Sequence, residues 1–89
     1  MGRERDAVNV NVKLFAIVKD RAGGAAALTL ALPESATVAT AGRTLVQRFP
    51  AMAELEPRVA YAVNREYARR ETVLRDGDEL AVIPPVSGG

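Results

Sequence analysis

Apolar and polar residues alternate near the start of this 89-residue chain, and this alternation constrains the fold more than any other feature. The even-numbered residues from 8 to 18 are all apolar, namely Val8, Val10, Val12, Leu14, Ala16 and Val18. The positions between them are Asn9, Asn11, Lys13, Phe15 and Ile17. Successive side chains of a strand point to opposite faces, so a period of two predicts a strand with one buried face over residues 8–18. Another part of the chain must cover that face.

The next segments predict a second strand and a helix. The stretch ALTLAL, residues 27–32, alternates again after a short glycine-containing loop, which predicts a hairpin with the first strand. Residues 33–50 fit a helix with an N-cap at Thr37 or Ser35. Gly42 lies in the middle of that helix, where it costs about 1 kcal/mol relative to alanine. We therefore expect the helix to lie close to the sheet there.

Two more strands are predicted in the second half of the chain, over residues 59–64 and 79–83, with Leu74 as a buried residue in the connection between them. The order strand, strand, helix, strand, strand predicts an α+β fold in which one helix covers one face of a mixed sheet. This is the β-grasp, or ubiquitin-like, arrangement. In it the last strand lies in the middle of the sheet, beside the first.

These boundaries divide the chain into a frayed, charged leader (1–7), a β-grasp domain (8–83) and a flexible extended tail (84–89). The tail consists of Pro84, Pro85, Val86, Ser87, Gly88 and Gly89. Six extended residues reach about 20 Å, and the paired prolines stiffen the base of the arm. Chain ends are often frayed and without function. A narrow arm on a stiff base instead favours entry into another protein's active site, with the carboxylate of Gly89 as the reactive group.

The composition excludes several kinds of chemistry. The chain has no cysteine and no histidine, so thiol nucleophiles, histidine bases and Cys/His metal sites are excluded. Its 12 basic and 11 acidic residues are spread along the length, which does not support nucleic-acid binding. No apolar run approaches the roughly 20 residues of a membrane span. We expect a cytoplasmic protein that binds no metal, no membrane and no cofactor of its own.

Two polar segments have simpler interpretations than ligand sites. The sequence ARR at 68–70 is typical of a solvated edge rather than a phosphate site. The acidic residues Asp76, Asp78 and Glu79 match no metal-binding loop, and a turn at Asp76-Gly77 explains them.

An apolar patch is expected where the tail leaves the domain. Phe15 and Ile17 fall on the face of the first strand opposite the core, and Ile83 does so on the last strand. Neighbouring strands would bring these three side chains together, and contiguous exposed apolar area is typical of interfaces. The alternative is that connecting residues cover this face within the monomer.

Three stretches of the chain resemble the small subunit of molybdopterin synthase, a family of ubiquitin-like sulfur carriers. They are VKLFAIVKDRAG near the start, AVNREY in the third predicted strand, and the closing DGDELAVIPPVSGG. The resemblance covers nearly the whole chain from Val10 onward, and the closing stretch is its specific part. The charged leader and the small residues of the ATAGRT helix segment depart from the family pattern.

The resemblance implies a function that needs no catalytic side chain. In the family the C-terminal glycine, here Gly89, is adenylated by a ubiquitin-activating-like enzyme that uses ATP and Mg, and a persulfide donor then converts it to a thiocarboxylate. The tail inserts into a large catalytic subunit and gives its sulfur to cyclic pyranopterin monophosphate. Two small and two large subunits form the usual assembly. Positions matching Phe15, Tyr67 and Ile83 contribute to binding the large subunit.

Other functions stay open on the sequence alone. Related carriers serve tRNA thiolation, cysteine synthesis or thiamin synthesis, and they also end in Gly-Gly. A ubiquitin-like protein modifier or a passive binding module is a further alternative, whereas an enzyme that uses its own side chains is the reading with least support.

Overall fold

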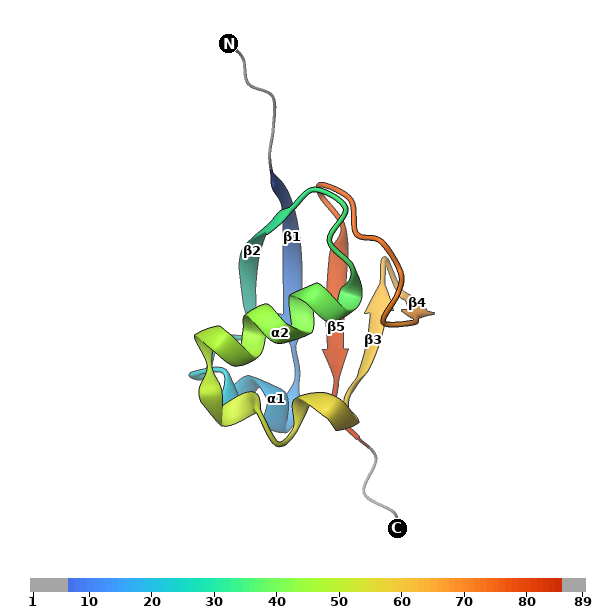
Figure 1. Cartoon of the computed structure of the whole chain (residues 1–89). Helices are drawn as coiled ribbons and strands as arrows, with labels where there is room; N and C mark the ends of the chain where they lie inside the picture. The colour runs from blue at the N-terminus through green and yellow to red at the C-terminus, as the bar shows by residue number, and fades with distance from the viewer. Residues whose placement is uncertain (1–6, 86–89) are drawn as a thin grey trace.

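A five-stranded mixed sheet forms the centre of the molecule, which the computed structural model describes over residues 7–85 (Figure 1). Its strands are β1 (Ala7–Leu14), β2 (Ala27–Pro33), β3 (Ala60–Val63), β4 (Glu66–Ala68) and β5 (Glu79–Ile83). They lie in the order β2-β1-β5-β3-β4. β5 runs parallel to β1 and antiparallel to β3. The predicted β-grasp arrangement, with the last strand beside the first, is confirmed.

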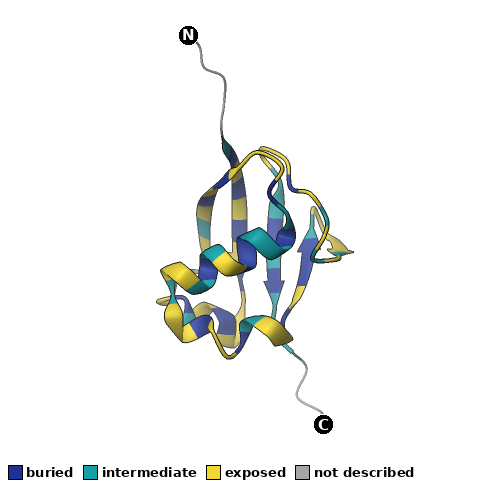
Figure 2. Ribbon diagram, in the orientation of Figure 1, coloured by how far each residue is buried: buried dark blue, intermediate teal, exposed yellow. Residues whose placement is uncertain are grey.

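The core lies between this sheet and α2 (Val38–Arg48), which crosses one face of it (Figures 1 and 2). The even-numbered residues of β1 are buried and the odd-numbered residues Asn9, Asn11 and Lys13 are exposed, as the alternation predicted. The buried core residues of the other strands are Leu30, Leu32, Tyr61, Leu80 and Val82. Burial of one side of the sheet therefore fixes which residues face outward on the other.

α2 begins at the predicted N-cap. Thr37 and Thr40 form a reciprocal capping box, in which the Thr40 N–H donates to Thr37 Oγ1 at 3.3 Å and the Thr37 N–H to Thr40 Oγ1 at 3.1 Å. These bonds satisfy N–H groups that have no partner inside the helix. Val38, Ala41 and Leu45 are fully buried on the inner face of the helix.

The first strand is shorter than predicted, because the chain enters a helix after Leu14. α1 (Ala16–Arg21) begins at Ala16, whose φ of 51° interrupts the extended backbone. Val18 was predicted as a strand residue, but it lies in α1 and its side chain is buried in the core. The spacing of four between Leu14, Val18 and Ala22, all buried, fits a helix as well as a strand. β1 and β2 still pair antiparallel, with α1 inside the connection between them.

The second half of the chain differs from the prediction by one additional strand. Asn64 and Arg65 have φ values of 51° and 74°, which are typical of a two-residue hairpin turn, and the chain then forms β4 along β3. The connection from α2 to β3 contains the short 3₁₀ helices η1 (Pro50–Met52) and η2 (Glu56–Arg58). Leu74 is buried between β4 and β5, as expected.

Two boundaries of the predicted domain division can be placed. Residues 1–6 of the leader lie outside the described residues, and Ala7 is already the first residue of β1. β5 ends at Ile83, as predicted. None of the helices within residues 7–85 combines the length and apolar character of a membrane span.

Candidate functional site

The tail begins directly after a strand that is held on both sides. β5 pairs with β1 from Glu79 to Val82 and with β3 from Leu80 to Ile83. Pro84 and Pro85 follow without regular structure and are half-buried. Neither proline has an N–H group that could extend the ladder. The predicted tail residues Val86, Ser87, Gly88 and Gly89 lie outside the described residues.

The sheet face opposite α2 is the outward face. Its strand register places one row of side chains across five strands, in the order Ala27, Lys13, Ala81, Ala62 and Tyr67. A second row, nearer the tail, pairs Ala60 with Ile83. On β5 and β3 the residues of these two rows are small or apolar, whereas the neighbouring strand β1 places Asn9, Asn11 and Lys13 on the same face. We call Ala60, Ala62, Tyr67, Ala81 and Ile83 the tail-root face.

The tail-root face is open to solvent in part. Tyr67 exposes 78% of its surface, Ala60 is exposed, and Ala81 and Ile83 are half-buried. Only Ala62 of this face is buried. The predicted partner-binding residues Tyr67 and Ile83 therefore lie on one face, with β3 between their strands. The alternative in which connecting residues cover the face is not what the structure shows.

Phe15 and Ile17 reach the surface by a different route from the one predicted. They belong to the start of α1 rather than to a strand, and they expose 49% and 42% of their surfaces. Phe15 follows Leu14, which is paired with Val82, so its backbone lies at the same end of the sheet as Ile83. Its carbonyl accepts the Val18 N–H at 3.0 Å. The N-cap position therefore places Phe15 beside the tail root, and Ile17 follows two residues later as the second residue of α1.

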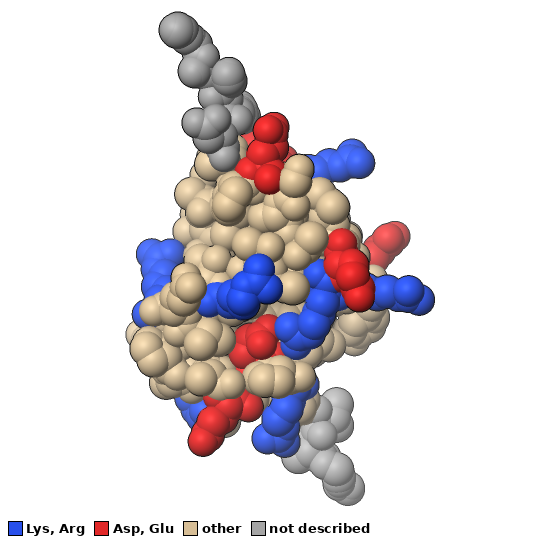
Figure 3. Space-filling model, in the orientation of Figure 1, with Lys and Arg blue, Asp and Glu red and all other residues tan. Residues whose placement is uncertain are grey.

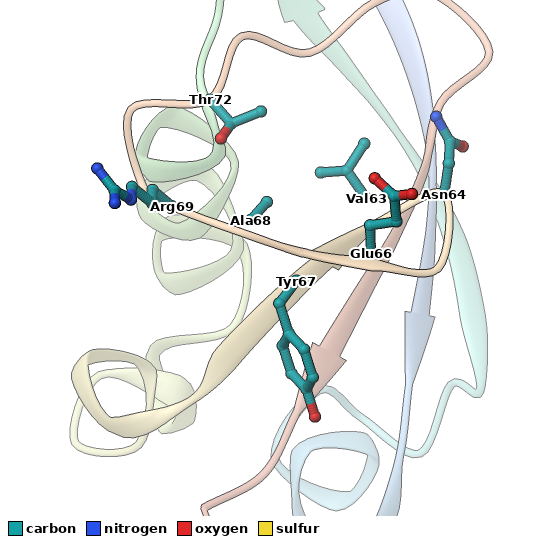
Figure 4. A pocket seen from close by; sticks show the side chains of 7 residues that line it. All are labelled: Val63, Asn64, Glu66, Tyr67, Ala68, Arg69 and Thr72. Carbon is teal, nitrogen blue, oxygen red and sulfur yellow. The ribbon is translucent and has the colours of Figure 1, made fainter.

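A shallow hollow of about 640 Å³ lies along β4 (Figure 4). Val63, Asn64, Glu66, Tyr67, Ala68, Arg69 and Thr72 line it. In Figure 4 the Tyr67 ring points away from the other lining side chains, and the Arg69 side chain also points outward. The hollow lacks a converging set of polar groups, so it does not have the character of a substrate pocket.

On the α2 side of the sheet, a polar cluster joins η2, β3 and the segment after β4, and it lies against Gly42 of α2. Glu56 Oε2 accepts the Tyr61 hydroxyl at 2.7 Å and Arg70 Nη1 at 2.6 Å, while Arg70 Nη2 donates to the Glu56 carbonyl at 2.9 Å. The Arg70 guanidinium lies 5.3 Å from the centre of the Tyr61 ring. Burial, and then the neighbouring Glu56 carboxylate, raise the pKa of Tyr61 above its ordinary value. Tyr61 is therefore held as a neutral donor and is not a base.

This cluster also explains Gly42. A Cβ at that position would overlap Glu56 Oε2 and would lie 2.8 Å from the Tyr61 hydroxyl oxygen. The predicted close approach of the helix to the sheet is confirmed, because Tyr61 belongs to β3. Residues 68–70, predicted as a solvated edge, begin in the edge strand β4; Arg69 is exposed, and Arg70 keeps 40% of its side-chain surface exposed while it pairs with Glu56.

The acidic residues before β5 shape a turn. Asp78 accepts the Arg75 N–H at 2.8 Å and an Asn64 side-chain N–H at 2.9 Å, and Asp76 accepts the Asn9 N–H at 2.7 Å. Within residues 7–85 no group of three or more carboxylates, histidines or cysteines is placed to hold a metal ion. On the α2 side of the molecule, basic and acidic side chains are interspersed (Figure 3).

The ThiS family model matches residues 12–89. The molybdopterin synthase sulfur carrier subunit of Arabidopsis thaliana is 36% identical to this chain over 86 residues, which cover 97% of this chain and 88% of that protein. Among solved structures, a putative molybdopterin converting factor subunit 1 from Pyrococcus furiosus has a TM-score of 0.81 and 32% identity to this chain. The match covers 89% of this chain and 99% of the Pyrococcus chain. SAMP1 from Haloferax volcanii has a TM-score of 0.78 and 34% identity, and the match covers 91% of this chain and 99% of the SAMP1 chain.

Proposed function

Because this chain belongs to the ThiS family and is homologous to molybdopterin synthase sulfur carrier subunits, we propose that its terminal glycine carries sulfur for a molybdopterin synthase. The observation that carries the proposal is the match to a curated sulfur carrier over 97% of the chain. The fold supports it, since β5 delivers the chain to Pro84 beside the tail-root face.

The chemistry takes place at the carboxylate of Gly89. A carboxylate is a poor acyl donor, so an activating enzyme of the ubiquitin-activating type first joins it to the AMP part of ATP, with Mg, and pyrophosphate leaves. The terminal sulfur of a persulfide then attacks the acyl carbon and AMP leaves. A thiol cleaves the resulting S–S bond, which leaves a thiocarboxylate on Gly89 and a disulfide on the donor. No side chain of this protein takes part, in agreement with the absence of cysteine and histidine.

The acceptor reaction takes place in a partner. The thiocarboxylate enters the active site of a large catalytic subunit and transfers its sulfur to cyclic pyranopterin monophosphate. The tail-root face, together with Phe15 and Ile17, is the surface on which that subunit docks. Two small and two large subunits assemble, and they work in the cytoplasm. This surface suits the role because it combines exposed apolar side chains with the start of the tail.

Mass spectrometry of the intact chain tests the proposal. Incubation with the activating enzyme, ATP and a persulfide donor should raise the mass by the difference between one sulfur and one oxygen atom. A variant with one alanine added after Gly89 should fold like the original chain and show no such gain. An unchanged mass of the original chain, or a gain in the extended variant, would contradict the proposal.

The curated relatives do not favour the alternative pathways, but one control separates them. The similarity to the small archaeal modifier protein 1 of Haloferax volcanii shows that a protein named as a modifier shares this fold. A modifier would appear in cell extracts as covalent conjugates on lysines of other proteins, lost when Gly88 and Gly89 are deleted. A carrier for another pathway would acquire the sulfur but fail to support molybdopterin formation with the large subunit.

A further inference from the structure

The two edges of the sheet are protected to different degrees. The outer strand β4 has three residues, one of which is Glu66, and short, charged edges resist pairing with other chains. The other outer strand, β2, has seven residues with the sequence ALTLALP and no charge. None of its residues has a positive φ. A long, uncharged edge is a template for another strand.

The ladder shows which groups β2 offers. The Leu14 N–H donates to the Ala26 carbonyl at 2.9 Å, so every second residue of β2 from Ala26 onward faces β1. The N–H and C=O groups of Ala27, Thr29 and Ala31 therefore point away from the sheet. Within residues 7–85, no backbone hydrogen bond from another element reaches these groups. Their side chains are exposed on the outward face.

The sequence of this edge is its own complement. Residues 27–31 read Ala-Leu-Thr-Leu-Ala, which is the same in both directions about Thr29. A second copy placed antiparallel would align Thr29 with Thr29, and each alanine with an alanine. Threonine pairs across antiparallel strands are favourable, and a two-fold interface requires this self-complementarity.

We propose that β2 is a self-association edge, at which two copies pair antiparallel about Thr29. The same register sets residue 34 of one copy opposite residue 24 of the other. Glu34 is exposed, and the Gly24 N–H donates at 2.9 Å to the carbonyl of Lys19, which belongs to α1 with its net positive charge. Glu34 of each copy thus lies opposite the uncharged loop that follows α1 in the other copy, next to a helix with one net positive charge.

The pairing leaves the sulfur-carrying surface free. β2 is separated from β5 by β1, and the tail-root face lies on β5, β3 and β4. The ladder involves five residues of each copy, which is smaller than the interfaces of stable dimers. The dimer therefore forms weakly and reversibly. This inference does not depend on the proposed function.

Sedimentation velocity of the full chain, over a concentration series up to the order of 1 mM, tests it. The sedimentation coefficient should rise with concentration. Thr29→Lys and Thr29→Glu should each weaken association by about fivefold or more, because like charges would face each other across the axis. An equimolar mixture of the two variants should restore it, because unlike charges then face each other.

Ala60→Lys is the matched control, since it adds the same charge to the outward face at the tail root. It should leave self-association unchanged. Amide hydrogen exchange at Ala27, Thr29 and Ala31 should slow as the protein concentration rises, with no such change at β4. Any of three results would overturn the proposal. The chain could stay monomeric at every concentration, or Ala60→Lys could lose association while Thr29→Lys keeps it. The third is that the mixture of Thr29→Lys and Thr29→Glu fails to restore pairing. Circular dichroism verifies that every variant is folded.

Discussion

The carboxylate of Glu56 brings together three segments of the chain. It accepts hydrogen bonds from Tyr61 of β3 and from Arg70 after β4, and it lies against Gly42 of α2. The side chain of Glu56 is 14% exposed and that of Arg70 is 40% exposed. The contact is therefore only partly shielded from water, and the Glu56 carboxylate occupies the space in which a Cβ at position 42 of α2 would lie.

Gly42→Ala tests this geometry. Alanine favours a helix over glycine by about 1 kcal/mol, whereas a hydrogen bond to a charged group contributes about 1.5–3 kcal/mol. Because the added methyl would displace the Glu56 carboxylate, we expect a net loss of about 1 kcal/mol, measured by urea unfolding. In a Glu56→Ala background the loss should become smaller. An equal loss in both backgrounds would show that the carboxylate is not the cause.

Tyr61 should make the protein sensitive to alkaline pH. Its pKa is raised in the folded state above the ordinary value of 10.0, so the unfolded chain loses the proton first. The stability from the neutral hydroxyl is complete below pH 10 and declines as pH rises beyond it. The unfolding free energy measured from about pH 8 to 11 should fall above pH 10, and Tyr61→Phe should flatten that fall. Tyr67→Phe, at an exposed position, is the control and should leave the slope unchanged.

At the scale of elements, strands with a regular pattern could be predicted and short elements could not. β2 and β5 were predicted nearly to the residue, because alternation and flanking turn residues marked their ends. α1 was missed because the spacing of four between Leu14 and Val18 fits both the period of a strand and that of a helix. β4 was missed because its three residues, Glu66–Ala68, are too few to show a period, and its place is set by the turn at Asn64.

The candidate site was predictable to the same extent. The sequence placed Ile83 at the tail root because β5 alternates regularly. It placed Phe15 and Ile17 on a strand, whereas Phe15 is the N-cap residue of α1 and Ile17 lies in that helix. Tyr67 came from family resemblance alone. The Glu56–Arg70 ion pair joins residues 14 positions apart with no local signal, so only the folded chain shows it.

The junction between β1 and α1 gives a prediction at this scale. Ala16 has a φ of 51°, which costs an L-residue about 1–2 kcal/mol and costs glycine nothing in sterics. Glycine loses about 0.5–1 kcal/mol in backbone entropy, so we expect Ala16→Gly to stabilise the protein by up to about 1 kcal/mol. Chemical denaturation gives the value. Ala27→Gly, at an exposed position in β2, should lower the unfolding free energy. If Ala16→Gly lowered it by a similar amount, strain at the junction would not be the cause.

For the whole molecule, we expect substitutions on the outward face to weaken binding of the large subunit without destabilising the fold. Tyr67 is 78% exposed, so Tyr67→Ala should change the unfolding free energy by no more than about 0.5 kcal/mol. Truncation of a central aromatic residue at an interface costs about 2 kcal/mol of binding free energy. Titration calorimetry with the large subunit should show that loss. Val73→Ala removes another exposed apolar side chain, away from the tail-root face, and should bind normally.

The parallel pairing of β1 with β5 affects how the molecule would respond to a pulling force. The pairing runs from Asn11 and Glu79 to Leu14 and Val82, so the outer ends of the two strands, Ala7 and Ile83, point in opposite directions. Tension applied between these ends would load the rungs of the ladder in shear, all at once, rather than peel them apart in turn. An ATP-driven unfoldase that grips the chain beyond Ile83 would thus meet its greatest mechanical resistance at the first step.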